Sequence, residues 1–502
     1  MQMTKSELNG SVNKQEKMLL FVVFLVSVAV RLKINYSTEY IGGGNGAYYL
    51  VLVRNLLEKG SLVYGEFPLL FWLEAAIAYI PLKLGLMNMN AAIDFSSRMF
   101  DSIIPALSIL PAYLLTKKLL GDKANHPQTI IIASASVLYI AFFTLVSDFQ
   151  KNALGLLWLF SLLYWILKVH EKKSLKNVCF AALFLFLTAV THYGCIAVAI
   201  AIAAIDLLIK YALKFSWKKL AKGLSIAVIV NIVVYVVVYI VNPWRAQALI
   251  EAPLKIFDDP VLSFILKREP VISPIDLITI ILVNSIALIS LYKFIRKFKS
   301  LNEKHRGFVL TMILTSLFLS SPFLGLEVAQ RLYFISYVVA LPLLAFIYID
   351  LNSDYLRKTM IGILSLVLLV STLLSFARPN YSNMNRTLYA EMTKLKNVLP
   401  EEEKTLIVAR HGLEFWSSWI FRNMAVRQEE LGESYWRWYN KVYFLIQKKD
   451  KSPFGPAGLF GKPFPEPTIP EKSKRVFENE YFAIYNCTEP PKDFSIFNKR
   501  HR

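Results

Sequence analysis

The sequence predicts a polytopic α-helical membrane protein with about eleven transmembrane helices and a small α/β domain at its C-terminal end. The first observation is composition: 55% of the 502 residues are hydrophobic, only 18% are charged, and the mean hydropathy is +0.45. The second is a series of long apolar runs through the first 377 residues, and the third is the return of mixed polarity after them. Ordinary soluble domains have neither this composition nor such a series.

The apolar runs define the predicted membrane spans, since a helix needs about 20 apolar residues to cross a bilayer. The first run, "MLLFVVFLVSVAV", has no small-residue cleavage site after it, so we expect it to be a retained span. A further run at 67–86 carries Glu74, Pro81 and Lys83, which favours a helix at the membrane surface. The predicted spans are 18–36, 99–116, 127–146, 153–168, 177–191, 193–209, 223–242, 275–292, 307–325, 332–349 and 359–376.

The distribution of basic residues predicts the orientation of these helices. Loops on one side of the bundle hold most of the loop Lys and Arg residues, and loops on the other side hold few. Because cytoplasmic loops carry the excess of basic residues, the first side and the N-terminus are predicted to be cytoplasmic. If 67–86 crossed the membrane, the N-terminus would be outside and there would be twelve spans, and charge alone leaves this alternative open. The net charge of +20 is thus explained by topology, and no nucleic acid partner is expected.

The segment after residue 377 is predicted to form a separate domain outside the membrane. Strand-like runs occur at "TLIVAR" (405–410), "KVYFLIQ" (441–447) and "YFAIYNC" (481–487), with a helix-like stretch and a Pro/Gly-rich stretch between them. A length of roughly 120 residues is enough for a hydrophobic core. We therefore expect a transmembrane domain at 1–377 and an extracytoplasmic α/β domain at 378–502.

The loop after the first span reads "EYIGGGNGAYYL" and contains Glu39 and Asn45. Its glycines suit a flexible link to an amphipathic helix at 47–60. They equally suit a close approach of backbone amides to a phosphate or a sugar. On periodicity alone, the flexible link is the simpler interpretation.

Three later outer segments carry candidate residues, each with two interpretations. Asp148 and Lys151 in "SDFQKN" fit a helix cap with a snorkelling lysine, or a site in which the carboxylate orients an acceptor or holds a metal and the lysine contacts a phosphate. His192 fits a hydrogen-bonded turn, or the lining of a polar cavity. Glu327 and Arg331 fit an i,i+4 ion pair, or a site in which the arginine binds a lipid-linked phosphate.

Taken in order, these segments resemble the GT-C superfamily of membrane glycosyltransferases. That superfamily includes dolichyl-phosphate-mannose protein mannosyltransferases, lipid A aminoarabinose transferases and the catalytic subunit of oligosaccharyltransferase. The resemblance is carried by Arg31, "GGGNGAYYL", "GEFPLLFWLEA" (65–75), "RMFDSIIPALSILPAYLLTKKLLGD" (98–122) and "QRLYFISYVVALPLLA" (330–345). It implies a GT-C-like fold with two juxtamembrane helices in the first outer loop, and so it favours eleven spans.

The resemblance also implies an activity and a set of site residues. The chain is expected to be a multi-pass cell-membrane glycosyltransferase, a hexosyltransferase, with the lipid bilayer and a polyprenyl (dolichyl) phosphate sugar donor as partners. The acceptor is expected to be a glycan, a protein or a lipid outside the cytoplasm. The predicted catalytic residues are Glu39, Glu66 and Asp148. The predicted substrate-binding residues are Asn45, Tyr48, Lys151, His192, Glu327 and Arg331.

Two features depart from the family pattern. The position of the usual first-loop aspartate, three residues before the tyrosine pair, holds Asn45, whose amide cannot act as a base, so Glu39 or Glu66 must take that role. The "WWDYG" motif of oligosaccharyltransferases is absent, which disfavours transfer of a whole glycan to asparagine. Asn45 favours an alternative, a protein that binds lipid-linked saccharides without transferring them. A transporter or flippase is disfavoured, because no internal repeat is evident.

The sequence signals no nucleotide or metal chemistry. It has no Walker motif, dinucleotide fingerprint, HExxH or G-x-S-x-G, and a sugar activated by a lipid phosphate needs no nucleotide site. The cofactor is unknown, and a divalent cation, Mn or Mg, stays open. Asp258 and Asp259 suit a loop turn before Pro260 better than a metal pair.

Overall fold

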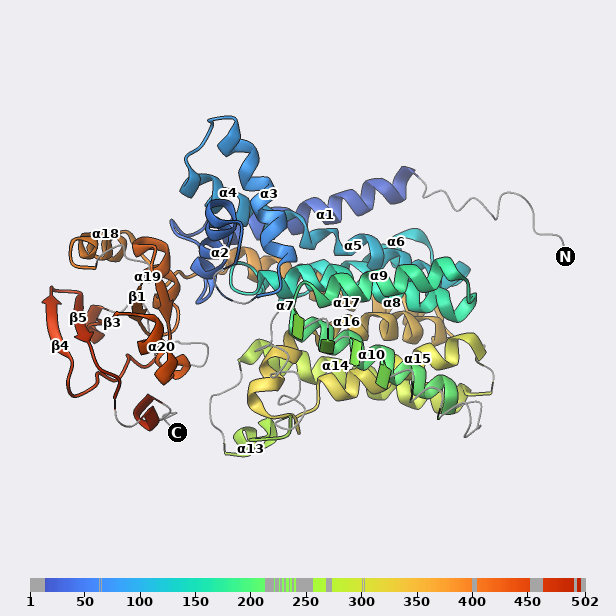
Figure 1. Ribbon diagram of the computed structural model, residues 1–502. Helices are drawn as coiled ribbons and strands as arrows, with labels where there is room; N and C mark the ends of the chain where they lie inside the picture. Colours follow the sequence, from blue (N-terminus) through green and yellow to red (C-terminus); the bar gives the residue numbers. More distant parts are fainter. Residues whose placement is uncertain are drawn as a thin grey trace. The chain divides into compact units, whose positions relative to one another are not determined.

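The structure is a computed structural model, and its description covers most of the chain (Figure 1). The described residues are 14–212, 256–267, 273–299, 301, 303–399, 404–451, 464–491 and 494–497, apart from 63 and 65, with scattered residues between 221 and 240. Contacts divide the chain into two compact units. The first comprises Met1–Lys33, Phe67–Leu70 and Asp101–Arg378, and the second comprises Ile34–Glu66, Phe71–Phe100 and Pro379–Arg502.

The helices of the first unit follow the apolar runs of the sequence. They are α1 (Lys14–Asn35), α5 (Ile109–Leu120), α6 (His126–Leu138), α7 (Ile140–Phe143), α8 (Gln150–Glu171), α9 (Leu175–Ala189), α10 (Tyr193–Ala212), α13 (Val261–Leu266), α14 (Pro274–Lys297), α15 (Glu303–Leu319), α16 (Leu326–Asp350) and α17 (Asp354–Ala377). Within the described residues, seven helical segments are long and apolar enough to cross a membrane, and three more are apolar but shorter. The prediction of a polytopic helical membrane protein is confirmed.

The structure describes helices at ten of the eleven predicted spans, and the span predicted at 223–242 lies mainly outside the described residues. The run at 67–86 forms α3 (Leu69–Lys83), which has 15 residues. At 1.5 Å per residue it is roughly 22 Å long, shorter than the hydrocarbon core of about 30 Å. The predicted span at 177–191 forms α9, which also has 15 residues, so length does not distinguish α3 from a span and the total number of spans stays a prediction.

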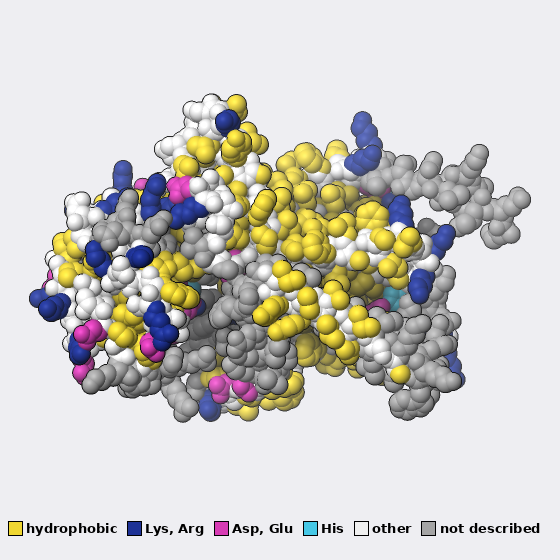
Figure 2. Space-filling model, in the orientation of Figure 1, with side chains coloured by type: hydrophobic (Ala, Val, Ile, Leu, Met, Phe, Trp, Pro, Cys, Tyr) yellow, Lys and Arg dark blue, Asp and Glu magenta, His cyan; other side chains and the backbone are white. Residues whose placement is uncertain are grey.

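Ion pairs join the helices at the end of the bundle where α1 begins. Figure 2 shows hydrophobic side chains along the helices of this unit and Lys and Arg gathered at that end. The pairs are Lys117 with Glu16 at 3.2 Å, Lys118 with Glu171 at 3.1 Å and Lys293 with Asp350 at 2.7 Å. This end carries the loops that the sequence predicts to be cytoplasmic, and the charges there can stay outside the hydrocarbon core.

The second unit combines most of the first outer loop with the C-terminal segment. Its helices are α2 (Gly46–Lys59), most of α3 and of α4 (Met89–Ile103), α18 (Arg386–Lys394), α19 (Leu413–Phe421) and α20 (Glu433–Trp438). Its strands are β1 (Thr405–Val408), β2 (Met424–Val426), β3 (Lys441–Gln447), β4 (Lys474–Glu478) and β5 (Phe482–Cys487). The boundary after Arg378 lies next to the predicted boundary at 377, while residues 34–66 and 71–100 group with the C-terminal segment.

The five strands form one sheet in the order β2-β1-β3-β5-β4. Strands β1, β2 and β3 run parallel, and β5 runs antiparallel to β3 and to β4. One face packs a core that includes Leu406, Val408, Val442 and Phe444. The three predicted strand-like runs are confirmed as β1, β3 and β5, and the predicted α/β class is confirmed with them. Because β1, β2 and β3 are parallel, their carboxyl ends meet at one edge of the sheet.

A buried arginine joins the first outer loop to the C-terminal segment within this unit. Arg54 on α2 is 3% exposed and donates hydrogen bonds to the carbonyls of Trp419 at 2.6 Å and Ser418 at 2.8 Å, near the end of α19. Its guanidinium also lies 4.6 Å from the centre of the Trp419 ring. Burial lowers the pKa of Arg54 to about 10, so the side chain stays charged at neutral pH. The Trp419 carbonyl lies in the last turn of α19, where carbonyls lack helical partners, and Arg54 supplies a donor there, while the Ser418 carbonyl also accepts the amide of Arg422 at 3.1 Å.

We predict that Arg54→Met lowers the free energy of unfolding of this unit by about 2–3 kcal/mol, because two charge-assisted hydrogen bonds are lost at a buried site. Pulse proteolysis of the detergent-solubilised protein measures the change. Arg437→Met is the matched control, since Arg437 on α20 is exposed and its i,i+4 bond to Glu433 is worth less than about 0.5 kcal/mol. Equal losses in the two variants would contradict the role given to Arg54.

Candidate functional site

The backbone of the first outer loop is held in place by Arg98, a residue of α4 that is 1% exposed. Its guanidinium donates hydrogen bonds to the carbonyls of Thr38 at 3.1 Å and Glu39 at 3.0 Å, and also to the carbonyl of Asn35. Asp94, one turn earlier on α4, pairs with the same guanidinium at 2.9 Å. The backbone of the loop that carries Glu39 is therefore fixed by the guanidinium of Arg98.

The predicted base Glu39 is accessible to water, and its side chain is 57% exposed. The nearest cation is the guanidinium of Arg386, 3.9 Å away, and that side chain is itself 87% exposed. Glu66, the other carboxylate of this region, is only 7% exposed and lies three residues before α3. The two candidate carboxylates thus differ in their access to solvent.

The glycines of this loop approach another segment of the chain. The amide of Gly43, at φ +80°, donates to the carbonyl of Tyr381 at 2.8 Å. A Cβ on Gly42 would collide with the amide group of Asn380, and the carbonyl of Gly44 accepts a hydrogen bond from Asn383 at 3.4 Å. The structure thus brings the backbone of these glycines close to residues 380–383, and their approach to a phosphate or sugar stays a prediction. Because these glycines have no side chain, the loop backbone can contact residues 380–383.

Asn45 and Tyr48 lie at the start of α2. Asn45 occupies the N-cap position, and its carbonyl accepts a hydrogen bond from the amide of Tyr48 at 3.0 Å. The ring of Tyr48 is 8% exposed and packs edge-to-face against Phe415 at 5.1 Å and Phe71 at 5.8 Å. Tyr48 therefore contributes to the aromatic core of the second unit, a role that sequence analysis did not assign to it.

In the first unit, a buried ion pair fixes the segment that carries Asp148. The side chains of Arg31 and Asp101 are both fully buried, and Arg31 Nη2 lies 2.7 Å from Asp101 Oδ1. The other carboxylate oxygen of Asp101 accepts the amide of Ser147 at 3.0 Å. Ser147 has a φ of +68°, a conformation that costs free energy in a residue other than glycine. Asp101 thus stabilises the turn that sets the direction of Asp148.

The start of α8 presents several polar groups in a closely packed place. Asp148 is 7% exposed and Lys151 is 9% exposed. Gln150 and Asn152, at 1% and 4%, flank the lysine. Four polar residues with so little exposure among the five positions 148–152 are uncommon at the mouth of a membrane helix, where a snorkelling lysine reaches water. The snorkelling interpretation of Lys151 is therefore disfavoured.

A second group in the first unit collects around Tyr193 at the start of α10. The ring of His192 lies 5.0 Å from the ring of Tyr193, and the guanidinium of Arg331 lies 5.4 Å from the same ring. The turn before His192 is joined to the first residue of α3, because the amide of Leu69 donates to the carbonyl of Val190 at 3.2 Å. The structure thus brings His192 and Arg331 together through a tyrosine that sequence analysis missed.

The predicted site residues fall into the two units. Glu39, Asn45, Tyr48 and Glu66 belong to the second unit, and Asp148, Lys151, His192 and Arg331 belong to the first. Glu327 is the second residue of α16, and its side chain lies outside the described residues. Over the described part of the chain, no group of three or more His, Cys, Asp or Glu residues is arranged to hold a metal ion.

Comparison with known proteins identifies the architecture through its fold. No family model and no curated protein matches the sequence. The chain is similar to the oligosaccharyltransferase of Archaeoglobus fulgidus in the apo form, with a TM-score of 0.57, 13% identity, and coverage of 85% of this chain and 69% of that one. It is also similar to ArnT from Cupriavidus metallidurans bound to undecaprenyl phosphate, with a TM-score of 0.51, 11% identity, and coverage of 94% and 97%.

The chain therefore shares its fold with this oligosaccharyltransferase and with ArnT, as the resemblance to the GT-C superfamily predicts. The predicted fold class is thereby confirmed, apart from the number of spans. Sequence analysis missed two charged residues that the GT-C fold buries in this chain, Arg98 and Asp101. Both stand in "RMFDSIIPALSIL", and a signal was present, because two opposite charges at the start of an apolar run need partners when they are buried.

We predict that Asp101→Asn destabilises the first unit by about 3–5 kcal/mol, because the charge of Arg31 is left buried without a carboxylate. Thermal unfolding in detergent measures the loss. Asp354→Asn is the control, since Asp354 has an 86% exposed side chain in the first turn of α17. Unchanged stability of Asp101→Asn would show that Arg31 does not depend on this ion pair.

A second prediction concerns the glycine loop. Gly42→Ala is expected to lower the stability of the second unit by about 1–3 kcal/mol, because Asn380 must move to admit the methyl group. Gly432→Ala is the control, since the nearest atom to its added Cβ is Ser434 Oγ at 3.8 Å. Limited proteolysis of both variants, scored at residues 378–385, would reveal loosening of the loop only in the first. A stable Gly42→Ala variant would contradict the close packing.

Proposed function

We propose that this protein is a membrane glycosyltransferase that transfers a sugar from a polyprenyl-phosphate donor to an acceptor outside the cytoplasm. The observation that carries the proposal is the GT-C fold, which extends over 94% of this chain and 97% of ArnT. That ArnT structure is bound to undecaprenyl phosphate, a lipid phosphate of the proposed class. A sugar carried on such a lipid is already activated, in keeping with a sequence that has no nucleotide motif.

The residues proposed to bind the lipid phosphate lie in the first unit. Arg331 presents a guanidinium beside the ring of Tyr193, and a cation against a ring face is held in position. Lys151 is a second cation, kept in a place with little access to water. Positive charge fixed where the phosphate leaves would stabilise the charge that develops in the transition state. His192 can donate a further hydrogen bond at the same turn.

The proposed reaction is a single displacement with inversion. A carboxylate removes the proton from the acceptor hydroxyl, the hydroxyl oxygen forms a bond to the anomeric carbon, and the bond from that carbon to the phosphate oxygen breaks. Glu39 is the proposed base, because its carboxylate is exposed to an incoming acceptor while Arg98 holds its backbone. Glu66 and Asp148 are proposed to orient the substrates, since both are nearly excluded from solvent.

Asn45 supports the alternative function, binding of a lipid-linked saccharide without transfer. An asparagine at this position offers hydrogen bonds but cannot accept the proton. Under this alternative, the cations and carboxylates would recognise the donor, and no bond would break. Release of polyprenyl phosphate distinguishes the two functions.

We predict that Glu39→Gln lowers the rate of sugar transfer by about 10²–10⁴-fold, the usual contribution of a general base. The measurement is the release of polyprenyl phosphate from a panel of polyprenyl-phosphate hexoses by the purified full-length protein in detergent. Glu66→Gln and Asp148→Asn are expected to lower the rate of transfer and also to raise KM, because their carboxylates are proposed to bind substrate.

The control variant is Glu433→Gln, which removes a 63% exposed carboxylate on α20. The proposed site would be refuted if each of the three single variants, Glu39→Gln, Glu66→Gln and Asp148→Asn, released polyprenyl phosphate at the wild-type level. No release by the wild type, with release gained in Asn45→Asp, would support the binding-only alternative.

A further inference from the structure

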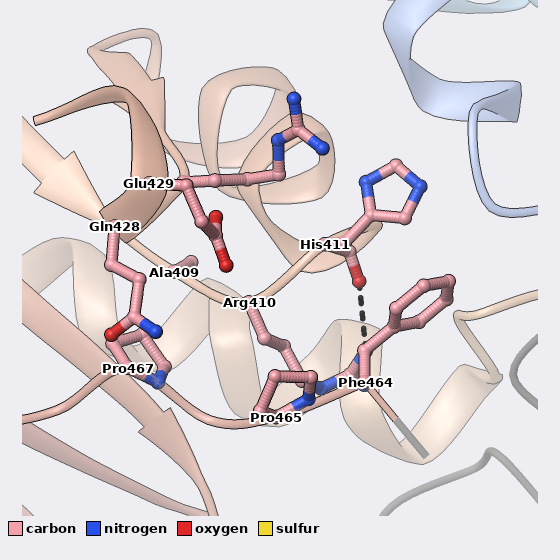
Figure 3. A pocket seen from close by; sticks show the side chains of 9 residues that line it. Ala409, Arg410, His411, Gln428, Glu429, Phe464, Pro465 and Pro467 are labelled. Carbon is pink, nitrogen blue, oxygen red and sulfur yellow. Dashed lines mark hydrogen bonds between the residues drawn. The ribbon is translucent and has the colours of Figure 1, made fainter. Parts of the chain in front are cut away.

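The C-terminal domain contains a cavity that the proposed reaction does not use. It has a volume of about 110 Å³, and Figure 3 shows its lining side chains. They come from the residues after β1, the residues after β2 and a later segment, and they are Ala409, Arg410, His411, Arg427, Gln428, Glu429, Phe464, Pro465 and Pro467. A cavity needs roughly 10–15 Å³ to hold one water molecule, so this one has room for a small ligand.

The cavity lies at the edge of the sheet where open α/β folds usually bind ligands. The chain passes from β1 through α19 to β2 on one side of β1, and β3 then pairs with the other side. In open α/β sheets, ligands bind in the crevice outside the carboxyl ends of the strands where the order reverses. Arg410, directly beyond β1, donates a hydrogen bond to the side chain of Gln447 at the end of β3. The lining thus lies at the carboxyl ends of β1 and β2, and Arg410 links it to the carboxyl end of β3.

One wall of the cavity is fixed by polar contacts. Glu466, between the two lining prolines, lies 3.0 Å from Arg410 Nε and accepts the backbone amide of Gln447 at 3.0 Å. The amide of Thr468 donates to the side chain of Gln428 at 2.7 Å. Burial raises the pKa of the Glu466 carboxyl to about 7, although Arg410 acts in the opposite direction. The wall is therefore formed before any ligand enters, which lowers the cost of binding.

Negatively charged ligands do not suit this cavity. Its two arginines already form ion pairs with carboxylates. Arg410 pairs with Glu466, and Arg427 pairs with Glu430 at 2.6 Å. A helix N-terminus at this edge would attract a phosphate, but the first turn of α19 holds the buried Glu414, which pairs with His411 at 3.0 Å. Glu429 lines the cavity, and Glu414, Glu430 and Glu466 pair with its lining residues, so four carboxylates surround two arginines and disfavour an anion.

The remaining polar groups suit a ligand that is uncharged and rich in hydroxyl groups. Figure 3 shows the carboxylate of Glu429 directed between Gln428 on one side and His411 and Phe464 on the other. A carboxylate can accept hydrogen bonds from two hydroxyl groups, and a planar guanidinium or imidazole donates hydrogen bonds to neighbouring oxygens. Phe464 and the two prolines offer apolar surfaces, and the Phe464 ring lies edge-to-face against His411 at 4.6 Å. Polar groups that can orient a ligand, set beside apolar surfaces, are typical of small-molecule sites.

We propose that this cavity binds an uncharged sugar residue. The inference rests on the proposed function in one respect. If the protein transfers a sugar, a glycan acceptor is a ligand that is rich in hydroxyl groups and would be present at the protein. It deepens that function by selecting a glycan from among the three acceptor classes. The recognised unit is a single sugar, since the cavity is too small for an extended chain.

The test is saturation-transfer NMR on the full-length protein in detergent, with methyl α-glucoside, methyl α-mannoside and methyl α-galactoside as ligands. At least one glycoside is expected to bind, and Glu429→Gln is expected to weaken it by about tenfold, because a charged acceptor of hydroxyl protons is lost. Glu429 is exposed, so the variant should fold, and circular dichroism checks this. Glu433→Gln, an exposed carboxylate outside the lining, is expected to bind as the wild type does.

Three results would overturn the inference: no glycoside binds, Glu429→Gln binds like the wild type, or glucuronate or inorganic phosphate binds more tightly than the glycosides. Release of polyprenyl phosphate is measured separately on the same preparation. Release without glycoside binding would reject the sugar cavity and keep the glycosyltransferase. Binding that depends on Glu429 without any release would keep the cavity and reject the transferase.

Discussion

The helical unit depends on one buried ion pair, between Arg31 at the end of α1 and Asp101 near the end of α4. Removing two charges from water is costly, and the cost is tolerated only when the remaining polar atoms find partners. Here the guanidinium also donates to the carbonyls of Asp101 at 2.8 Å and Phe142 at 3.0 Å, and the carboxylate accepts the amide of Ser147. The pair thus positions α1, α4, α7 and the turn into α8 with a single set of contacts.

Hydrophobic periodicity was sufficient to predict most of the fold. Long apolar runs have few alternatives to membrane helices, and β1, β3 and β5 are short runs of buried apolar residues. Strand β2 has only three residues, and β4 reads "KRVFE" with a largely exposed surface, so neither carries a pattern above background. The parallel order of β1, β2 and β3 arises from pairing between distant segments, which local sequence does not encode.

The candidate site was less predictable, because its residues act through partners far away in the sequence. Sequence order placed Glu39, Lys151 and Arg331 in outer loops, but it could not show that Arg98 holds the backbone of Glu39 from 59 positions away. The glycine loop is the clearest example. A run of glycines permits close approach to any partner, and only the structure identifies that partner as residues 380–383.

The exposed edge strand β4 has a consequence for how copies of this protein behave side by side. An unpaired strand edge is a template for pairing with another sheet, and confinement to a membrane plane raises the local concentration of such edges. Lys474 and Arg475 place positive charge along this edge, and Lys448 binds Glu478 at 2.9 Å at its far end. Pairing with a second edge would remove these charged side chains from water, which costs free energy. The charged residues of β4, which gave the strand no recognisable pattern in the sequence, therefore protect neighbouring molecules from edge-to-edge aggregation.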